Sequence, residues 1–396
     1  MNTKKDIATF YLILMCIQII PIEGIEVSLI KFGAMCCAPM ILLTKVPYIT
    51  KALVWGGLYF TAILISVFFY WESLRLSTTG YLLVAMLMFI TFYNLIYFEK
   101  VFTVPYFTLM VKRLILAYTI VLLIQQIARI GAVRYGGFML INLEHLIDNS
   151  RFILTVNSLS IEPSHSARIV GALFLSLLRM YEIEWGKEHV TLSTIYQDNK
   201  WVLLGFLWTM LTMGSGSAIV CLLILALYFI RPKYAIPTTV LLLLFLFVAP
   251  YIKYKPLQRI TAITEAAFTL NSKTISDADL SASARVLPYI YTIQHFDLSK
   301  LETWIGNGTD SGRNNDKWGR KRMIGGMSDY GFLSYIFALV FIFSCCIRRF
   351  FSIETLFFII LLMAEIRNVY VWWAVLMLFT VTKYFYENNI KSRIDY

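Results

Sequence analysis

The sequence is dominated by apolar stretches that are long enough to cross a lipid bilayer. A transmembrane helix needs about 20 mainly apolar residues, and the stretches 52–70 and 80–98 reach that length without a charged side chain. Apolar residues make up 59% of the chain and charged residues 15%, whereas soluble domains average about 45–50% and about 25%. The sequence therefore predicts an all-α, polytopic integral membrane protein.

About twelve of these stretches are expected to be transmembrane helices. The first begins after Lys4 and Lys5, as a signal peptide would, but it lacks a small-x-small cleavage site and further spans follow it, so we expect it to be retained. The sixth, seventh, eighth and eleventh stretches are short. The expected spans are 7–22, 26–43, 52–70, 80–98, 114–130, 166–181, 201–213, 215–230, 235–252, 327–347, 353–365 and 369–386.

The net charge of +11 fits a membrane topology better than a nucleic-acid partner. No basic-aromatic nucleic-acid module is visible in the sequence. Lys and Arg instead gather in alternate connections between the expected spans, as they do in cytoplasmic loops. The short connections on the other side hold few, chiefly Arg75 and Arg367. This bias predicts that both termini lie in the cytoplasm.

Two long segments remain outside the membrane in this topology, 131–165 and 253–326. We therefore expect one transmembrane domain, 1–396, with a first external loop and a second, larger one. Within the larger loop, Ser276 and Asp279 resemble a helix start, and Pro288 should kink the helix that follows. Its apolar side recurs at helical spacing, which predicts an amphipathic helix lying on the membrane: Leu280, Ala284, Leu287 and Tyr291.

The cysteines and histidines do not predict a metal site, a disulfide framework or a bound cofactor. All six cysteines lie in or at the ends of apolar stretches, no C-x-x-C spacing occurs, and the four histidines are scattered.

Arginines are frequent in and beside the two external loops. Guanidinium groups form planar, permanently charged forks that suit phosphate oxygens, so this set could bind a lipid-linked diphosphate beside the membrane. The same side chains could instead snorkel, pair with loop carboxylates or contact lipid headgroups. They are Arg134, Arg151, Arg168, Arg259, Arg285, Arg313, Arg320 and Arg322.

Three residues could accept a proton near these arginines. Glu162 precedes the sixth span near Arg168, where it could deprotonate a sugar hydroxyl or simply complement the helix dipole. His295 could serve in the larger loop, as could Asp310, although a lone loop histidine is more often a solvated residue. Asp329, at the start of the tenth span, can be read as a helix cap.

Gly306-Asn307-Gly308 forms a flexible turn in the larger loop. Its backbone N–H groups could bind an anion, or it could be an ordinary turn. It is not a dinucleotide fingerprint, because it lacks the third glycine, the preceding strand and the following helix.

Taken in order, several of these motifs resemble those of the bacterial O-antigen polymerases (Wzy type), within the O-antigen polymerase and ligase group. The resemblance covers about residues 160–345 and depends on the order of the motifs and their placement relative to the spans. The motifs are Glu162-Pro163-Ser164, Thr212-Met213-Gly214-Ser215-Gly216-Ser217, Arg285, Ile305-Gly306-Asn307-Gly308 and Ser328-Asp329-Tyr330-Gly331-Phe332-Leu333.

The resemblance implies a glycosyltransferase of lipopolysaccharide biosynthesis in the bacterial inner membrane, with both external loops in the periplasm. Such an enzyme moves a polysaccharide from undecaprenyl diphosphate onto the sugar of an incoming lipid-linked repeat unit. The energy lies in the glycosyl–diphosphate bond, so neither a nucleotide nor a metal is required. The partners implied are the undecaprenyl-diphosphate-linked oligosaccharide, membrane lipid and a chain-length regulator protein.

Roles can then be assigned as hypotheses. Glu162, Arg285 and His295 are the candidate catalytic residues, with Glu162 the first choice of base and His295 the second. The candidate substrate-binding residues are Arg151, Arg168, Arg313, Gly306 and Gly308. Of the arginines, Arg168, Arg285 and Arg313 are expected to hold the diphosphate, and the two glycines are expected to shape the loop over the substrate.

Two other functions remain open. An O-antigen ligase is the first, but the related ligases place a histidine before the equivalent of Gly331, and this sequence has none after His295. A transporter or lipid flippase is the second. Transporters bring broken helices and ionisable residues to the middle of the membrane, and here Lys31 is the main candidate for such a residue.

Overall fold

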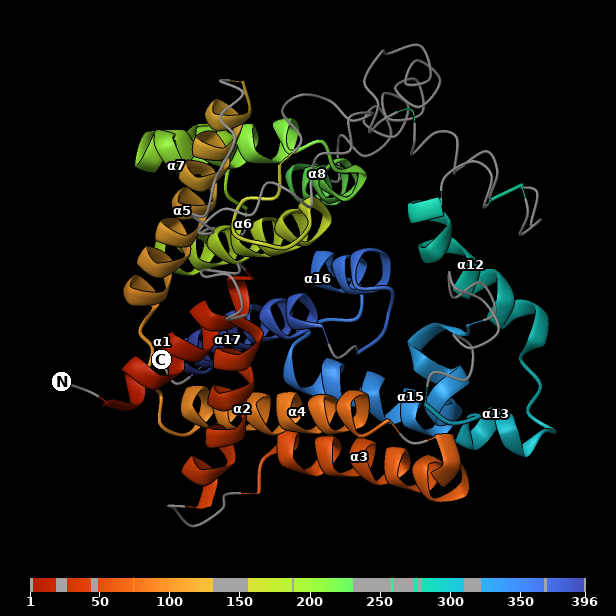
Figure 1. Cartoon of the computed structure of the whole chain (residues 1–396). Coiled ribbons are helices and arrows are strands. Elements are labelled where there is room, and N and C mark those ends of the chain that lie inside the picture. Colours follow the sequence, from red (N-terminus) through yellow and green to blue (C-terminus); the bar gives the residue numbers. More distant parts are fainter. Residues whose placement is uncertain are drawn as a thin grey trace.

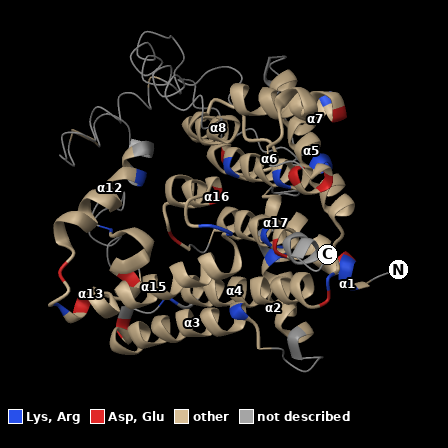
Figure 2. Ribbon diagram, turned by 180° about the vertical axis from the view of Figure 1, so that it is seen from behind, with Lys and Arg blue, Asp and Glu red and all other residues tan. Residues whose placement is uncertain are grey.

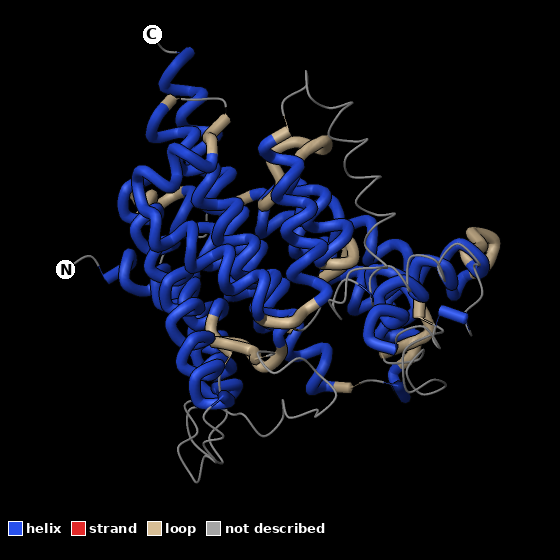
Figure 3. The backbone as a smooth tube through the Cα atoms, turned by 90° about the horizontal axis from the view of Figure 1, so that it is seen from above, coloured by secondary structure: helices blue, strands red, loops and turns tan. Residues whose placement is uncertain are grey.

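The computed structural model describes residues 3–18, 27–43, 49–73, 75–130, 156–186, 189–230, 258, 274–275, 280–309, 322–366 and 369–394. All regular secondary structure in these residues is helical (Figures 1 and 3). The ninth expected span, 235–252, most of the first expected external loop and about half of the larger one lie outside the described residues.

The helices follow the order of the expected spans. The longer ones are α1 (Thr3–Cys16), α2 (Val27–Leu43), α3 (Lys51–Phe69), α4 (Leu76–Tyr97), α5 (Val104–Ile130), α6 (Pro163–Trp185), α7 (Leu192–Thr212), α8 (Gly216–Phe229), α12 (Leu280–His295), α15 (Met327–Cys345) and α17 (Tyr370–Ile394). The shorter ones are η1 (Trp71–Ser73), α13 (Leu301–Ile305), η5 (Ile324–Gly326), α16 (Ile353–Leu356) and the π-helical η6 (Phe357–Leu361).

Among the described residues, four helical segments are long and apolar enough to cross a membrane: Lys51–Phe69, Ser77–Tyr97, Val104–Ala128 and Ile324–Cys345. Two shorter helices, Ile30–Ile41 and Gly216–Phe229, are also apolar. The described part of the chain is thus all-helical, with several helices suited to a membrane. The full count of about twelve spans stays a prediction.

Helices α6 and α17 form the centre of the bundle. They pack against each other, and nearly every residue of α6 from Ser166 to Glu182 is buried. Because other helices surround them, these two helices can carry polar side chains that a lipid-facing helix could not. The Thr382 hydroxyl, for example, donates to the Ser176 hydroxyl at 3.2 Å.

The helix ends sort onto two sides of the bundle. At one side, Lys4 forms an ion pair with Glu99 (2.7 Å), and Tyr97 donates to Glu387 (3.1 Å). We call this side the basic end. Both chain termini lie there, and the long helices are free of charge over most of their length (Figures 1 and 2).

The opposite side is called the motif end, because the sequence motifs begin there. The C-terminus of α1 meets the start of α6, where Gln18 N donates to Leu159 O (2.7 Å). The C-terminus of α3 meets the start of α15, where Ser66 Oγ donates to Asp329 O (3.0 Å). Helices α12 and α13 also lie on this side, away from the termini (Figure 1).

The eleventh expected span, 353–365, differs from a full transmembrane helix. Its helical residues end at Leu361, and nine helical residues extend only about 14 Å, half of the roughly 30 Å of hydrocarbon. The helix ends because Met363 and Ala364 have φ of 58° and 50°, which no right-handed helix contains. The chain then enters α17 through the largely buried segment 362–366.

Candidate active site at the motif end

Two of the sequence motifs contact each other directly through their backbones. Asn307 N donates to Ser328 O at 2.9 Å, and Gly308 N donates to Asp329 O at 3.2 Å. We call this contact, formed by residues 305–308 and 328–331, the glycine junction. It joins the end of α13 to the first turn of α15.

Glycine is required on both sides of this junction. Gly306 has φ 82° and ψ −170°, and Gly331 has φ 80° and ψ 173°, a region that only glycine populates readily. A Cβ atom on Gly306 would lie 2.4 Å from Asp329 O, and one on Gly331 would lie 2.2 Å from Trp304 O. Each glycine therefore lets the opposite backbone approach.

An ion pair lies beside the glycine junction. Arg322 Nη2 is 2.7 Å from Asp329 Oδ2, and the Asp329 side chain is only 4% exposed. The N-cap position of α15 belongs to Gly326, so the expectation that Asp329 caps this helix is not met. Ser328 Oγ accepts from Met323 N (2.6 Å), which holds the segment before α15 over the helix start.

Hydroxyl groups from α4 and the loop support the junction from the bundle side. The Thr79 hydroxyl is 3.2 Å from the Tyr330 hydroxyl and 3.5 Å from that of Thr309. Phe332 adds apolar support, because its ring packs edge-on against the rings of Phe296 and Trp304. The junction is thus attached to α3, α4 and α12 together.

The amphipathic helix predicted in the larger loop is present as α12, with Pro288 inside it. The Tyr289 hydroxyl donates to Ile359 O of η6 (2.8 Å). Thr292 Oγ1 accepts from Ile324 N of η5 (2.9 Å). These bonds hold α12 against η6 and against η5, the short helix that directly precedes α15.

Two candidate site residues lie on α12. Arg285 is half-buried near its beginning. His295 is its last residue and is exposed; its ring stacks on Tyr291 with 4.0 Å between centroids, and Nδ1 lies 3.1 Å from Tyr291 O. Because a carbonyl oxygen can only accept, Nδ1 carries the proton in this bond, and Nε2 then has the free lone pair of a base.

Two further candidates begin α6. Glu162 occupies the N-cap position, but its side chain makes no capping bond and is 62% exposed, with Oε2 3.9 Å from His165 Nε2. Arg168 is buried, and its guanidinium lies 5.0 Å from the centroid of the Trp372 ring of α17. Trp372 Nε1 in turn donates to Leu362 O (2.9 Å), so the segment 362–366 lies beside this group.

The structure therefore places the predicted residues of the motif end in three groups. Gly306, Gly308 and Asp329 lie in the glycine junction, and Arg322 lies beside it. The site prediction missed the ion pair between Arg322 and Asp329. Glu162 and Arg168 lie on the first turns of α6, and Arg285 and His295 lie on α12. Arg151 and Arg313 lie outside the described residues, as does Asp310.

The described part of the chain contains no group of three His, Cys, Asp or Glu side chains able to hold a metal ion. No protein-family model, no curated protein and no solved structure matches the chain.

Proposed function

We propose that this protein is a membrane glycosyltransferase of the O-antigen polymerase type. It would transfer a polysaccharide from undecaprenyl diphosphate to a sugar hydroxyl of the next lipid-linked repeat unit. The observation that carries this proposal is the glycine junction. Two motifs of the resemblance, separated by about twenty residues, pack against each other at the same end of the bundle as Glu162, Arg168 and Arg285.

In the proposed reaction, an acceptor hydroxyl oxygen attacks the anomeric carbon of the donor. The bond between that carbon and the diphosphate oxygen breaks, and the lipid diphosphate leaves with the bonding electrons. Guanidinium groups stabilise the negative charge that develops on it. Arg168 and Arg285 are the described candidates, and Arg313 is the third.

The hydroxyl proton passes to a base. Glu162 remains the first choice, because its exposed carboxylate can reach a substrate in solution. His295 is the second choice, through Nε2. The Asp329 carboxylate suits this step less well, since it is buried and paired with Arg322 (2.7 Å) and is therefore less accessible to a substrate.

The test is the length of the polysaccharide in a deletion strain that is complemented with variants. Arg285→Ala should abolish long chains, and Arg285→Lys separates the need for charge from the need for a planar fork. Arg113→Ala is the matched control, because Arg113 is an exposed arginine of α5 near the basic end. Full chain length with Arg285→Ala would remove Arg285 from the mechanism.

The ligase alternative predicts a different product in the deletion strain. A strain without a polymerase still adds a single repeat unit to its lipopolysaccharide, whereas a strain without a ligase adds none.

A transporter is favoured by one specific observation, the interrupted helix 353–361 followed by a buried non-helical segment with Glu365 only 3% exposed. The fully buried Lys31, over the Tyr370 ring at 3.9 Å, is a second feature of this kind. Inside-out vesicles that move a lipid-linked sugar without elongating it would support transport over polymerisation.

A further inference from the structure

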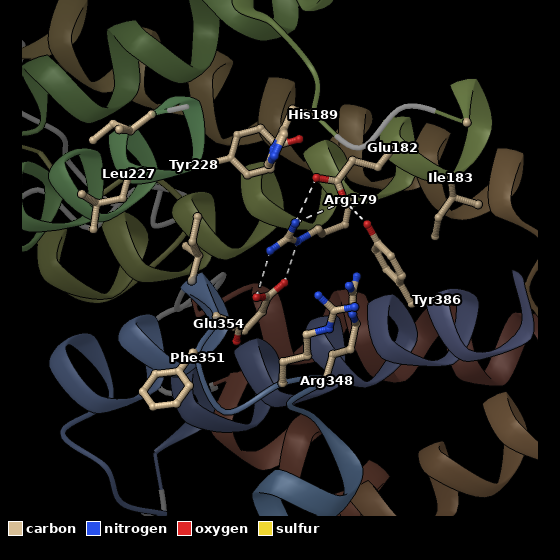
Figure 4. Close-up of a pocket in the computed structure, with 15 residues that line it drawn as sticks. Arg179, Glu182, Ile183, His189, Leu227, Tyr228, Arg348, Phe351, Glu354 and Tyr386 are labelled. Carbon is tan, nitrogen blue, oxygen red and sulfur yellow. Dashed lines mark hydrogen bonds and ion pairs between the residues drawn. The ribbon is translucent and has the colours of Figure 1, made fainter. Parts of the chain in front are cut away.

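A cavity of about 490 Å³ opens at the basic end, opposite the glycine junction. It lies between the C-terminal turns of α6 and α17 and the connection from α15 to α16 (Figure 4). Its charged and hydroxyl-bearing lining includes Arg179, Glu182, Arg348, Arg349, Glu354 and Tyr386.

The two glutamates of the cavity share a single arginine. Arg179 Nε is 2.7 Å from Glu354 Oε1, and Arg179 Nη1 is 2.9 Å from Glu182 Oε1. The Tyr386 hydroxyl also donates to Glu182. Figure 4 shows Arg179 between the two carboxylates. This network connects α6, α16 and α17, and its one guanidinium balances one of the two carboxylate charges.

The other two arginines form the cationic part of the cavity. The Arg348 guanidinium carbon lies 3.8 Å from the centroid of the Tyr386 ring. Stacking uses the face of a guanidinium and leaves the N–H groups at its edge for a ligand. Neither Arg348 nor Arg349 forms an ion pair with a carboxylate in the described part of the chain, so the cavity has an excess of positive charge.

Exposed aromatic side chains lie in the cavity lining and directly beside it: Phe351 lines the cavity, and the ring of Phe350 contacts that of Phe351. Phe350 is 63% exposed and Phe351 is 93% exposed, directly after the two arginines. Aromatic and basic residues side by side at a helix end are typical of the membrane–water interface. The cavity is therefore placed where a lipid headgroup would meet it.

We propose that this cavity binds a phosphate-bearing anion, and that its source is the headgroup of an anionic phospholipid. The phosphate oxygens accept from the N–H edges of Arg348 and Arg349, while the acyl chains lie against the exposed phenylalanines. The volume is within the range of small-molecule sites. A soluble phosphate would use the same arginines, so the experiment must separate the two sources.

The experiment measures lipid binding to the purified full-length protein by native mass spectrometry, with phosphatidylglycerol or phosphatidylcholine added. The wild-type protein should retain phosphatidylglycerol preferentially. The double variant Arg348→Gln/Arg349→Gln should lose this preference, with an affinity lower by about tenfold for each arginine. Inorganic phosphate and glycerol phosphate are added in parallel to find whether either competes.

The matched control is Arg113→Gln/Lys200→Gln, which removes two exposed charges of helices α5 and α7 and leaves the cavity intact. It should bind phosphatidylglycerol as the wild type does. Competition by millimolar inorganic phosphate would support the site and assign it to a soluble ligand. Equal phosphatidylglycerol binding by the wild type and the Arg348→Gln/Arg349→Gln protein would overturn the proposal. An equal loss of phosphatidylglycerol binding in the control and in the Arg348→Gln/Arg349→Gln protein would also overturn it.

Discussion

Replacing Gly331 with alanine is the sharpest test of the glycine junction. The residue has φ 80° and ψ 173°, so any side chain is strained there. A Cβ atom would lie 2.2 Å from Trp304 O and 2.5 Å from the carbonyl carbon of Ile305. Both neighbours are backbone atoms and cannot rotate away, so α13 and α15 must separate.

The cost can be worked from these contacts. A non-glycine residue in this region costs about 1–3 kcal/mol. Separation also breaks the bonds from Asn307 N to Ser328 O and from Gly308 N to Asp329 O, each worth about 0.5–1.5 kcal/mol. A total of about 2–6 kcal/mol is comparable with the stability of a whole domain. Because α13 is peripheral, we expect the junction to open while the bundle stays folded.

Hydrogen exchange at the amides of Asn307 and Gly308 measures that opening. A cost of 2 kcal/mol corresponds to about thirtyfold faster exchange, and the variant should also lose long-chain polysaccharide. Gly57→Ala is the control, since a Cβ atom there meets nothing within 4 Å and alanine favours the helix. Unchanged exchange in the Gly331→Ala protein would refute the close approach of the two backbones.

Two further predictions concern the basic end. Arg179→Gln should lower the unfolding free energy by about 3–5 kcal/mol, because it leaves two buried carboxylates without their cation; thermal unfolding in detergent measures this, and an unchanged melting temperature would contradict it. Partial burial opposes ionisation of Asp198, but the Lys112 ammonium and the Tyr181 hydroxyl outweigh it and keep the pKa of this carboxyl below its usual value. Ionised Asp198 therefore contributes its full stabilisation at pH values above the unfolded-state pKa of about 3.9. This contribution disappears as the pH falls through the lower pKa that Asp198 has in the folded protein. The difference in melting temperature between wild type and Asp198→Asn should be constant from pH 8 to about pH 5 and should narrow below about pH 4.

The candidate membrane helices were predictable where the sequence stays apolar over their whole length. The expected spans 52–70 and 80–98 correspond closely to α3 and α4, because an uninterrupted apolar stretch has few alternatives to a membrane helix. The expected span 166–181 is shorter than α6, which covers Pro163–Trp185. Hydropathy underestimates a helix that is surrounded by protein, since such a helix can carry charged residues in its terminal turns.

The site was predictable only in pieces. Gly306 and Gly331 both lie in motifs that the sequence makes visible, but their contact depends on how α13 packs on α15, which no local pattern encodes. The pairing of Arg322 with Asp329 was missed for a similar reason. The available signal was the placement of Arg322 before, and Asp329 after, the pair Gly325-Gly326. Glycines with positive φ let the chain fold back, which brings the arginine and the aspartate together.

The buried segment 362–366 contains two non-glycine residues with positive φ, Met363 and Ala364, which no sequence pattern predicts. Ala364 has φ 50° and is 7% exposed, and an L-residue in this left-handed region costs roughly 1–2 kcal/mol. Ala374 of α17 is equally apolar and fully buried, but its backbone is helical. Ala→Gly at each position removes the same buried methyl group and adds the same freedom to the unfolded chain.

The difference between the two substitutions therefore isolates the backbone strain. Ala374→Gly should destabilise the protein in thermal unfolding. The Ala364→Gly protein should be more stable than the Ala374→Gly protein by about 1–2 kcal/mol. Non-helical backbone at membrane depth is tolerated only where protein surrounds it. Strain at Ala364 would therefore mean that the surrounding contacts hold this segment in place. One of these contacts is the hydrogen bond from Trp372 Nε1 to Leu362 O. Equal losses at the two positions would mean that Ala364 is not strained, and that the interruption between η6 and α17 needs no compensating contacts.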